Sequence, residues 1–175
     1  MREKAQLFRA QSEVSSRVII MAFQGDSIFS KDSEKLISQI TGLKSIQLTA
    51  SCTQALEFAS LLINVGAGDE VITPSFNFTS SAIAIANYGA TPVFVDIDPK
   101  TLNIDPTKIE AAITPNTTAV LATHVYGNPC DIDAIHDIAD KYELKVIYDA
   151  AHCFGTLYKG KSVFAYGDIS TTSFH

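Results

Sequence analysis

The strongest constraint on the fold of this chain is a regular alternation of strand-like and helix-like segments from residue 45 onward. Short runs rich in β-branched and aromatic residues predict strands at 45–49, 70–73, 92–96, 118–123, 144–149 and 168–174. Segments with helical spacing of apolar residues lie between them, at 55–63, 80–87, 106–113 and 132–142. This alternation is typical of βαβ units, so we predict an α/β fold with a mostly parallel sheet flanked by helices.

The first 44 residues carry weaker signals. Ser30 is a suitable N-cap and Gly42 a suitable end for a helix over residues 30–42, whereas residues 2–24 show only a loose helical pattern. We find no internal repeat, low-complexity tract or linker in the 175 residues. The chain is therefore expected to form one domain.

Composition excludes several classes of partner. The chain is 46% hydrophobic and has a formal charge of −6 without a Lys/Arg cluster, which argues against nucleic-acid binding. The apolar run at 18–23 is too short to cross a membrane, and the polar residues 1–11 do not resemble a signal peptide. Three widely spaced cysteines, Cys52, Cys130 and Cys153, predict neither a disulfide framework nor a metal site. A cytoplasmic location is expected.

The segment 145–152 combines a buried-strand pattern with polar groups at its end. Asp149 closes the strand, Ala150 and Ala151 leave room for a flat ligand, and His152 adds a hydrogen-bonding ring. Open α/β sheets bind ligands at the carboxyl ends of their strands. A buried acid here suits a heteroaromatic nitrogen that must stay protonated, and pyridoxal 5'-phosphate (PLP) is the leading candidate. The alternative is that Asp149 only caps the turn after the strand.

Three more strand ends carry candidate ligand groups. At 48–55 a strand passes into a helix, and its first-turn N–H groups with Ser51 and Thr53 form a possible phosphate site or an ordinary N-cap. Phe76 and Phe78 follow the next strand, and alternation predicts that one faces the core and the other a ligand. The third loop, 123–127, places His124 and Tyr126 either near a substrate or in a structural pair.

Together these segments resemble the DegT-type, PLP-dependent nucleotide-sugar aminotransferases. The resemblance is carried by residues 49–56, 68–78, 92–98, 103–106, 124–127, 149–152 and 173–175, in the order and spacing of the family. It runs from about Thr41 to His175. The fold that it implies is the large domain of the aspartate-aminotransferase type, with the chain as its N-terminal part and the small C-terminal domain absent.

The resemblance also assigns roles to individual residues. Cys52, Thr53 and Ser173 are implied to hold the PLP phosphate. Phe78 is implied to stack on the pyridine ring, Asp149 to pair with its nitrogen, and His152 to hydrogen-bond its hydroxyl. The implied reaction moves an amino group, usually from glutamate, to a keto group of a nucleotide-linked deoxysugar. The implied assembly is a homodimer with sites built from both subunits.

One feature of the family pattern lies beyond the sequence. The lysine that forms the Schiff base with the cofactor stands five positions after the serine that matches Ser173, and the chain ends at His175. Lys159 and Lys161 flank a turn at Gly160 and are expected to be solvated, so no catalytic residue is assigned within the chain. We therefore expect an inactive fragment of an aminotransferase. The alternatives are the dehydratase branch of the family, in which His replaces this lysine, and a non-catalytic sugar-binding module.

Overall fold

The computed structural model describes residues 18–22 and 30–174, with the side chains of residues 32–174. Within this part of the chain, seven strands form one sheet in the order β2-β1-β9-β6-β5-β3-β4, and each neighbouring pair is parallel. The strands are β1 (Val18–Ala22), β2 (Ser45–Thr49), β3 (Glu70–Pro74), β4 (Thr91–Val95), β5 (Thr117–Thr123), β6 (Lys145–Asp149) and β9 (Ile169–Ser173). A short antiparallel pair, β7 (Leu157–Tyr158) and β8 (Lys161–Ser162), lies apart from it. The predicted α/β fold class is confirmed.

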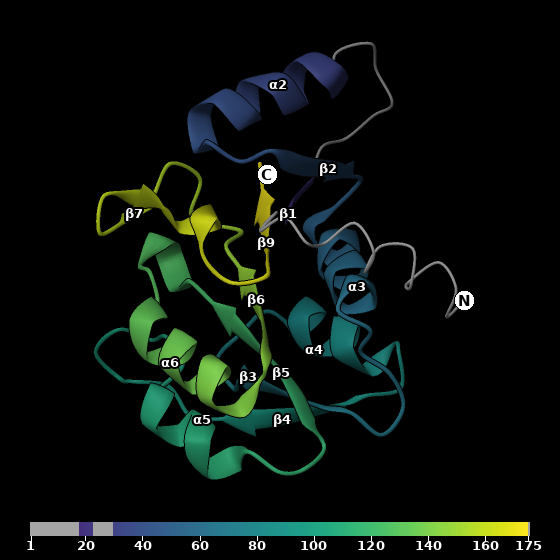
Figure 1. Cartoon of the computed structure of the whole chain (residues 1–175), viewed down its shortest axis with the longest axis vertical. Coiled ribbons are helices and arrows are strands. Elements are labelled where there is room, and N and C mark those ends of the chain that lie inside the picture. The colour runs from purple at the N-terminus through teal and green to yellow at the C-terminus, as the bar shows by residue number, and fades with distance from the viewer. Residues whose placement is uncertain (1–17, 23–29, 175) are drawn as a thin grey trace.

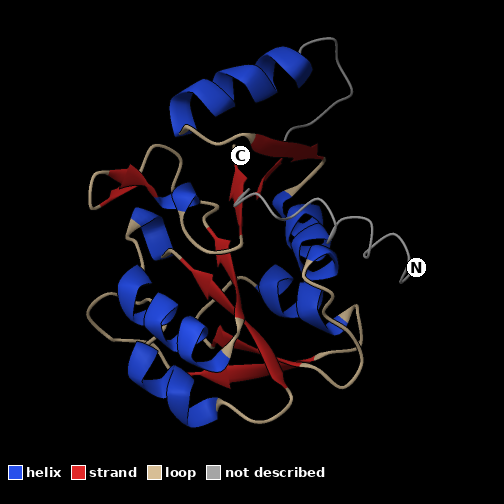
Figure 2. Ribbon diagram, viewed as in Figure 1, coloured by secondary structure: helices blue, strands red, loops and turns tan. Residues whose placement is uncertain are grey.

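Helices cover both faces of the sheet (Figures 1 and 2). The helices are α2 (Ser30–Thr41), α3 (Cys52–Leu62), α4 (Thr79–Ala86), α5 (Pro106–Ala112) and α6 (Ile132–Tyr142), with short 3-10 turns η1 (Val125–Gly127) and η2 (Val163–Ala165). In Figure 1, α3 and α4 lie on one side of the central strands, and α5 and α6 lie on the other. Helix α2 lies at the end of the molecule beside β2.

Side-chain alternation along the strands decides which residues meet which helices. Leu121 and Ile147 pack with α3 and α4, whereas Val120 and Tyr148 belong to the core cluster that includes α5 and α6. Successive strand residues point to opposite faces. A polar residue two positions after Leu121 or Ile147 therefore shares the face covered by α3 and α4.

Side-chain caps fix the starts of three helices. The Ser51 hydroxyl accepts a hydrogen bond from the N–H of Gln54 at the start of α3. Asp105 caps α5, in which Pro106 occupies the first turn, and Asp131 caps α6. Such caps satisfy N–H groups that have no carbonyl partner within the helix. The start of α3 is thereby placed at the carboxyl end of β2.

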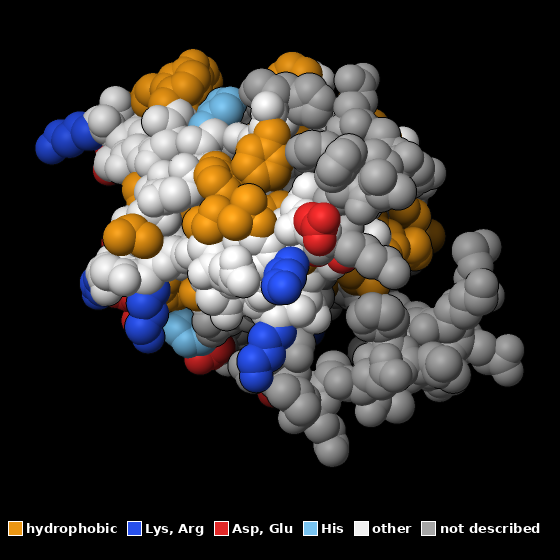
Figure 3. Space-filling model, turned by 90° about the horizontal axis from the view of Figure 1, so that it is seen from above, with side chains coloured by type: hydrophobic (Ala, Val, Ile, Leu, Met, Phe, Trp, Pro, Cys, Tyr) orange, Lys and Arg blue, Asp and Glu red, His pale blue; other side chains and the backbone are white. Residues whose placement is uncertain are grey.

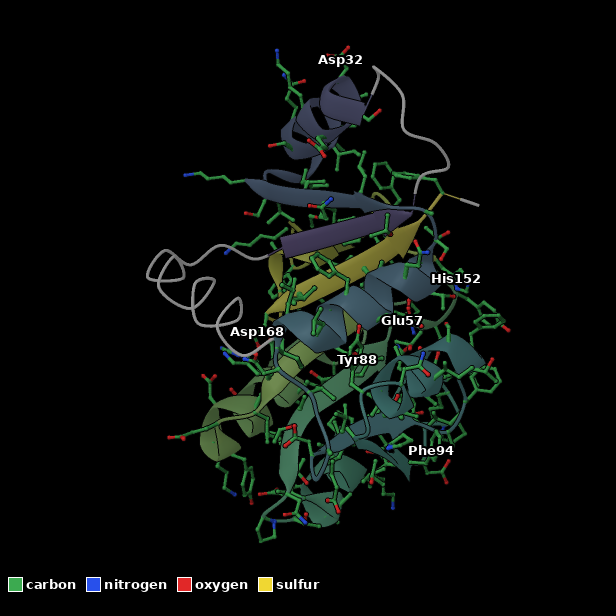
Figure 4. The ribbon with its side chains drawn as sticks, turned by 90° about the vertical axis from the view of Figure 1, so that its right-hand side faces the viewer. Asp32, Glu57, Tyr88, Phe94, His152 and Asp168 are labelled. Atoms are coloured by element: carbon green, nitrogen blue, oxygen red, sulfur yellow. The ribbon has the colours of Figure 1, made fainter. Side chains whose placement is uncertain are left out.

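The two ends of the sheet differ in character. At the amino ends, the Asp168 carboxylate accepts hydrogen bonds from the N–H of Val146 and from the Lys145 ammonium, each at 2.9 Å, which ties β6 to the residue before β9. Figure 4 shows His152 at the opposite end of the strands from Asp168. The carboxyl ends therefore carry the predicted ligand groups, and the amino ends carry a structural ion pair.

The first strand corrects the sequence interpretation. Residues 18–22 form β1 and hydrogen-bond to β2 and β9, so the loose helical pattern over residues 2–24 is wrong for this stretch, where a β-branched run is paired on both sides. Residues 2–17 and 23–24 lie outside the described part of the chain. The turn around Gly160 joins β7 to β8, and Lys159 is ion-paired with Asp133. None of the described helices is long and apolar enough to span a bilayer.

Candidate functional site

A cavity of about 440 Å³ opens where the carboxyl ends of the strands meet the start of α3. This volume is within the range of small-molecule and cofactor sites. All six residues that the sequence assigns to cofactor binding line it, namely Cys52, Thr53, Phe78, Asp149, His152 and Ser173. Their roles remain predictions, but the structure brings them together from four separate segments of the chain.

Asp149 is the buried charge of this cavity. The residue is 4% exposed at the end of β6, and burial raises the pKa of its carboxyl, with the Ala151 N–H, the Ser81 hydroxyl and His152 opposing part of the rise. Its Oδ1 accepts from the Ala151 N–H at 3.2 Å, and its Oδ2 accepts from the Ser81 hydroxyl at 3.1 Å. The turn-capping alternative is thus partly correct. Turn capping does not explain why the Asp149 carboxyl also lines a cavity. Nor does it explain why this buried carboxyl has no ion-pair partner among the described residues.

The start of α3 forms another wall. Ser51 serves as the N-cap, so the ordinary capping interpretation holds for that hydroxyl. Cys52 and Thr53, in the first turn, line the cavity, as does Ser173 at the end of β9. Burial, followed by the nearby Asp149, raises the pKa of the Cys52 thiol to about 12, so the thiol is neutral and does not repel an anion. First-turn N–H groups and the helix dipole favour a phosphate here.

Two phenylalanines border the cavity, which corrects the expectation that one would face the core. Phe76 is 43% exposed and Phe78 is 73% exposed, and both line the cavity. The strand ends at Pro74, and the bend that follows does not preserve strand alternation. Phe78 then stands at the N-cap of α4, where its ring is available to a flat ligand.

The loop after β5 divides its two aromatic residues between the core and the site. His124 is fully buried, stacks on Tyr148 with ring centroids 4.6 Å apart, and accepts the Cys130 N–H on Nδ1. Burial lowers the pKa of His124 to about 4, so it is a neutral structural residue. Tyr126, by contrast, lines the cavity and stacks on His152 with ring centroids 5.9 Å apart.

Sequence reasoning assigned no individual role to two residues at this site, Thr123 and Ser81. Thr123 lines the cavity, is 8% exposed, and its Oγ1 has no hydrogen-bond partner among the described residues. Ser81 reaches Asp149 from α4. The sequence placed Thr123 at the end of a predicted strand, in a loop whose polar groups could reach a substrate, and the structure pairs it in register with Asp149 on β6. Helical Ser81 had no comparable signal.

The surface carries exposed apolar side chains as well as the cavity. Figure 3 shows hydrophobic side chains gathered on the face of the molecule that is seen from above. Large exposed aromatics near the cavity or in the neighbouring loops include Phe76, Phe78, Tyr126, Phe154 and Phe174. The rings of Phe154 and Phe174 meet edge to face, with centroids 4.8 Å apart. A patch of this kind often marks an interaction surface.

Comparison with known proteins shows to which family the chain is similar. Residues 25–175 match the DegT/DnrJ/EryC1/StrS aminotransferase family. The chain belongs to this family. It is 45% identical over 141 residues to UDP-2-acetamido-2-deoxy-3-oxo-D-glucuronate aminotransferase of Pseudomonas aeruginosa, covering 81% of this chain and 39% of that protein. It is 43% identical to GDP-perosamine synthase of Caulobacter vibrioides, with 81% and 38% coverage.

A solved structure agrees with this membership. The chain superposes on NtdA from Bacillus subtilis, a structure with bound cofactor PMP (pyridoxamine phosphate), with a TM-score of 0.74 and 34% sequence identity. The match covers 92% of this chain and 36% of NtdA. The family member described here thus spans less than two-fifths of the length of these relatives.

Proposed function

We propose that this chain is the N-terminal part of the large domain of a PLP-dependent sugar aminotransferase. The reaction transfers an amino group from an amino acid, glutamate, to a keto group of a nucleotide-linked deoxysugar. The printed names of two relatives support the nucleotide-sugar substrate, and NtdA supports the cofactor. The proposal places the Schiff-base lysine at the third residue after His175, outside the sequence, so that residues 1–175 alone do not turn over.

A single observation carries the proposal. One cavity holds the buried Asp149 carboxyl, the first turn of α3 and the exposed ring of Phe78. A phosphorylated pyridine presents a ring nitrogen, a phosphate and an aromatic face, and each has a matching group in this cavity. The buried carboxyl is the discriminating feature, because a carboxylate at this depth is costly to keep without an opposite charge.

Each residue has a defined task in this arrangement. Asp149 holds a proton on the ring nitrogen, Cys52, Thr53 and Ser173 bind the phosphate, and His152 hydrogen-bonds the ring hydroxyl. Phe78 covers one ring face. The bound cofactor supplies an electron sink for amino-group transfer, and that sink depends on a protonated ring nitrogen. Orientation and protonation are therefore the contributions of these residues.

Two further observations, one on the cavity mouth and one on the cysteines, support the assembly and the location that we propose. Phe78 and Tyr126 border the cavity and are 73% and 74% exposed, which favours a second copy of the protein covering its mouth as a homodimer. The described cysteines are free, and two of the three are buried, which favours a reducing cytoplasm. Sedimentation of the parent protein tests the dimer, and a monomer at assay concentrations contradicts it.

Pyridoxamine phosphate is the probe that tests the site, because it binds without a lysine. Titration of the 175-residue chain by calorimetry is expected to give saturable one-to-one binding that Asp149→Ala weakens at least 10-fold. Absence of binding to the folded wild-type chain contradicts the proposal. Binding of nucleotide sugars without pyridoxamine phosphate indicates a sugar-binding module instead.

The reading frame after His175 provides an independent test. Lysine at the third following residue agrees with the aminotransferase proposal. Histidine there contradicts it in favour of the dehydratase branch. Release of 2-oxoglutarate from glutamate by the parent protein, in the presence of a keto-sugar nucleotide, then tests the reaction itself.

A further inference from the structure

Ser81 is a buried polar residue of α4 that is not among the residues lining the cavity. The residue is 0% exposed, and its hydroxyl donates a hydrogen bond to Asp149 Oδ2 at 3.1 Å. The two residues are 68 positions apart, on a helix and on a strand. Buried hydroxyls generally need a partner, and a serine in a helix can find one in the carbonyl four residues earlier. Ser60 of α3, equally buried, does so by donating to Leu56 O at 3.0 Å.

The Ser81 contact fixes the second oxygen of the Asp149 carboxyl. Oδ1 is held by the Ala151 N–H, which comes from the loop that follows β6. Oδ2 is held by the hydroxyl from α4. With one donor on each oxygen, rotation of the carboxyl plane breaks at least one hydrogen bond, while each oxygen keeps further capacity to accept. Asp149 lines the cavity, so that capacity is available to a ligand there.

Other groups near Asp149 do not duplicate this contact. Cys52 of α3 is neutral, and no hydrogen bond joins the described side chain of His152 to the carboxyl. Thr123 of β5 lines the same cavity, but its Oγ1 has no partner among the described residues. Among the described side chains, Ser81 is thus the one that hydrogen-bonds to the carboxyl.

We propose that Ser81 is a positioning residue whose hydroxyl holds the Asp149 carboxyl in the orientation that accepts the N–H of a protonated pyridine ring. This inference rests on the proposed function and adds a residue to it. Ser81 touches Asp149 rather than the cofactor, so its effect passes through the contact between Asp149 and the ring nitrogen. The affinity for a ligand without that nitrogen is therefore expected not to depend on Ser81.

The test compares pyridoxamine phosphate with its 1-deaza analogue, in which a C–H group replaces the ring nitrogen. Calorimetry measures both ligands against wild type, Ser81→Ala, Ser81→Thr and the matched control Ser60→Ala. Ser81→Ala is expected to weaken pyridoxamine phosphate about 10-fold, the loss of one hydrogen bond to a charged group, and to leave the 1-deaza analogue unchanged. Ser81→Thr, which keeps the hydroxyl, is expected to restore most of the affinity. Ser60→Ala is expected to bind both ligands as wild type does.

The possible outcomes separate the two proposals. If wild type binds pyridoxamine phosphate and Ser81→Ala binds it equally well, the positioning role is wrong and the proposed function stands. An equal loss for both ligands, in a variant with wild-type circular dichroism and melting temperature, also overturns the positioning role, because it indicates a general effect on the cavity. If folded wild type binds neither ligand, the proposed function itself is wrong.

Discussion

Thr123 and Asp149 are register partners on the adjacent parallel strands β5 and β6, and both line the same cavity. They differ in how their polar atoms are satisfied. Both carboxyl oxygens of Asp149 accept hydrogen bonds, whereas the buried Oγ1 of Thr123 has no partner among the described residues. A buried hydroxyl without a partner costs free energy in the ligand-free protein and becomes favourable when a ligand supplies an acceptor. Asp149 therefore already has hydrogen-bond partners within the described protein, whereas the Thr123 hydroxyl next to it is available to a ligand.

Thr123→Val tests this difference through stability. Because the substitution removes no protein hydrogen bond, the free energy of unfolding is expected to stay within about 1 kcal/mol of wild type or to rise. The matched control is Thr172→Val on β9, where the buried hydroxyl donates to Ala150 O at 2.9 Å, and a loss of about 1–3 kcal/mol is expected. Urea unfolding measures both. Equal destabilisation of the two variants shows that Thr123 has a partner.

Asp149→Asn is expected to raise the melting temperature of the ligand-free chain at pH 7. Burial raises the pKa of Asp149 in the folded state, so its ionised form destabilises the fold above that pKa. As pH falls through the raised folded pKa, the carboxyl takes up a proton and this penalty declines. The penalty is gone below the unfolded value of about 3.9. The gap between variant and wild type should therefore close on acidification, and a gap that widens contradicts the assignment.

His124 should produce the opposite dependence on pH. Burial lowers its pKa from 6.5 to about 4, so the unfolded chain binds a proton first as pH falls below 6.5. Stability from this group is fully present above pH 6.5 and declines toward pH 4, by up to about 3 kcal/mol. Proton NMR of the imidazole is expected to show a midpoint near pH 4, unless global unfolding occurs first. A midpoint near 6.5 in the folded chain is incompatible with the buried ring.

Phe78→Ala should separate binding from stability. The side chain is 73% exposed, so its removal is expected to change the melting temperature little. Loss of ring stacking is expected to weaken pyridoxamine phosphate roughly 3- to 10-fold. Phe94→Ala is the control, because Phe94 is 56% exposed on the edge strand β4 and does not line the main cavity. If both variants bind equally well, Phe78 does not contact the ligand.

Much of the fold could be predicted because proline and glycine residues mark where several helices and strands begin or end. Pro74 and Gly42 end elements, and Pro106 begins one, close to where the structure has them. The two-residue strands β7 and β8 are too short to show periodicity, and only the turn between them was predicted. Strand β1 was missed because its five apolar residues lie beside a longer mixed segment.

The candidate site was predictable to the extent that it follows strand ends. Asp149, His152 and Ser173 stand directly after or at the end of strands, where parallel sheets place their ligand groups. Ser81 was not predictable, because its hydrogen bond to Asp149 joins residues 68 positions apart and leaves no pattern in its own segment. The exposure of Phe76 required knowledge of the bend after Pro74.

The position of β9 within the sheet bears on how the protein is made. Strands β2 and β1 lie on one side of it, and β6, β5, β3 and β4 lie on the other. A ribosome delivers β9 after the other six strands, yet β9 is the one that joins the two groups by pairing with β1 and β6. Synthesis must therefore pass residue 173 before the two groups of strands become one sheet, and until then the edges of β1 and β6 that β9 will cover have no strand partner within this sheet.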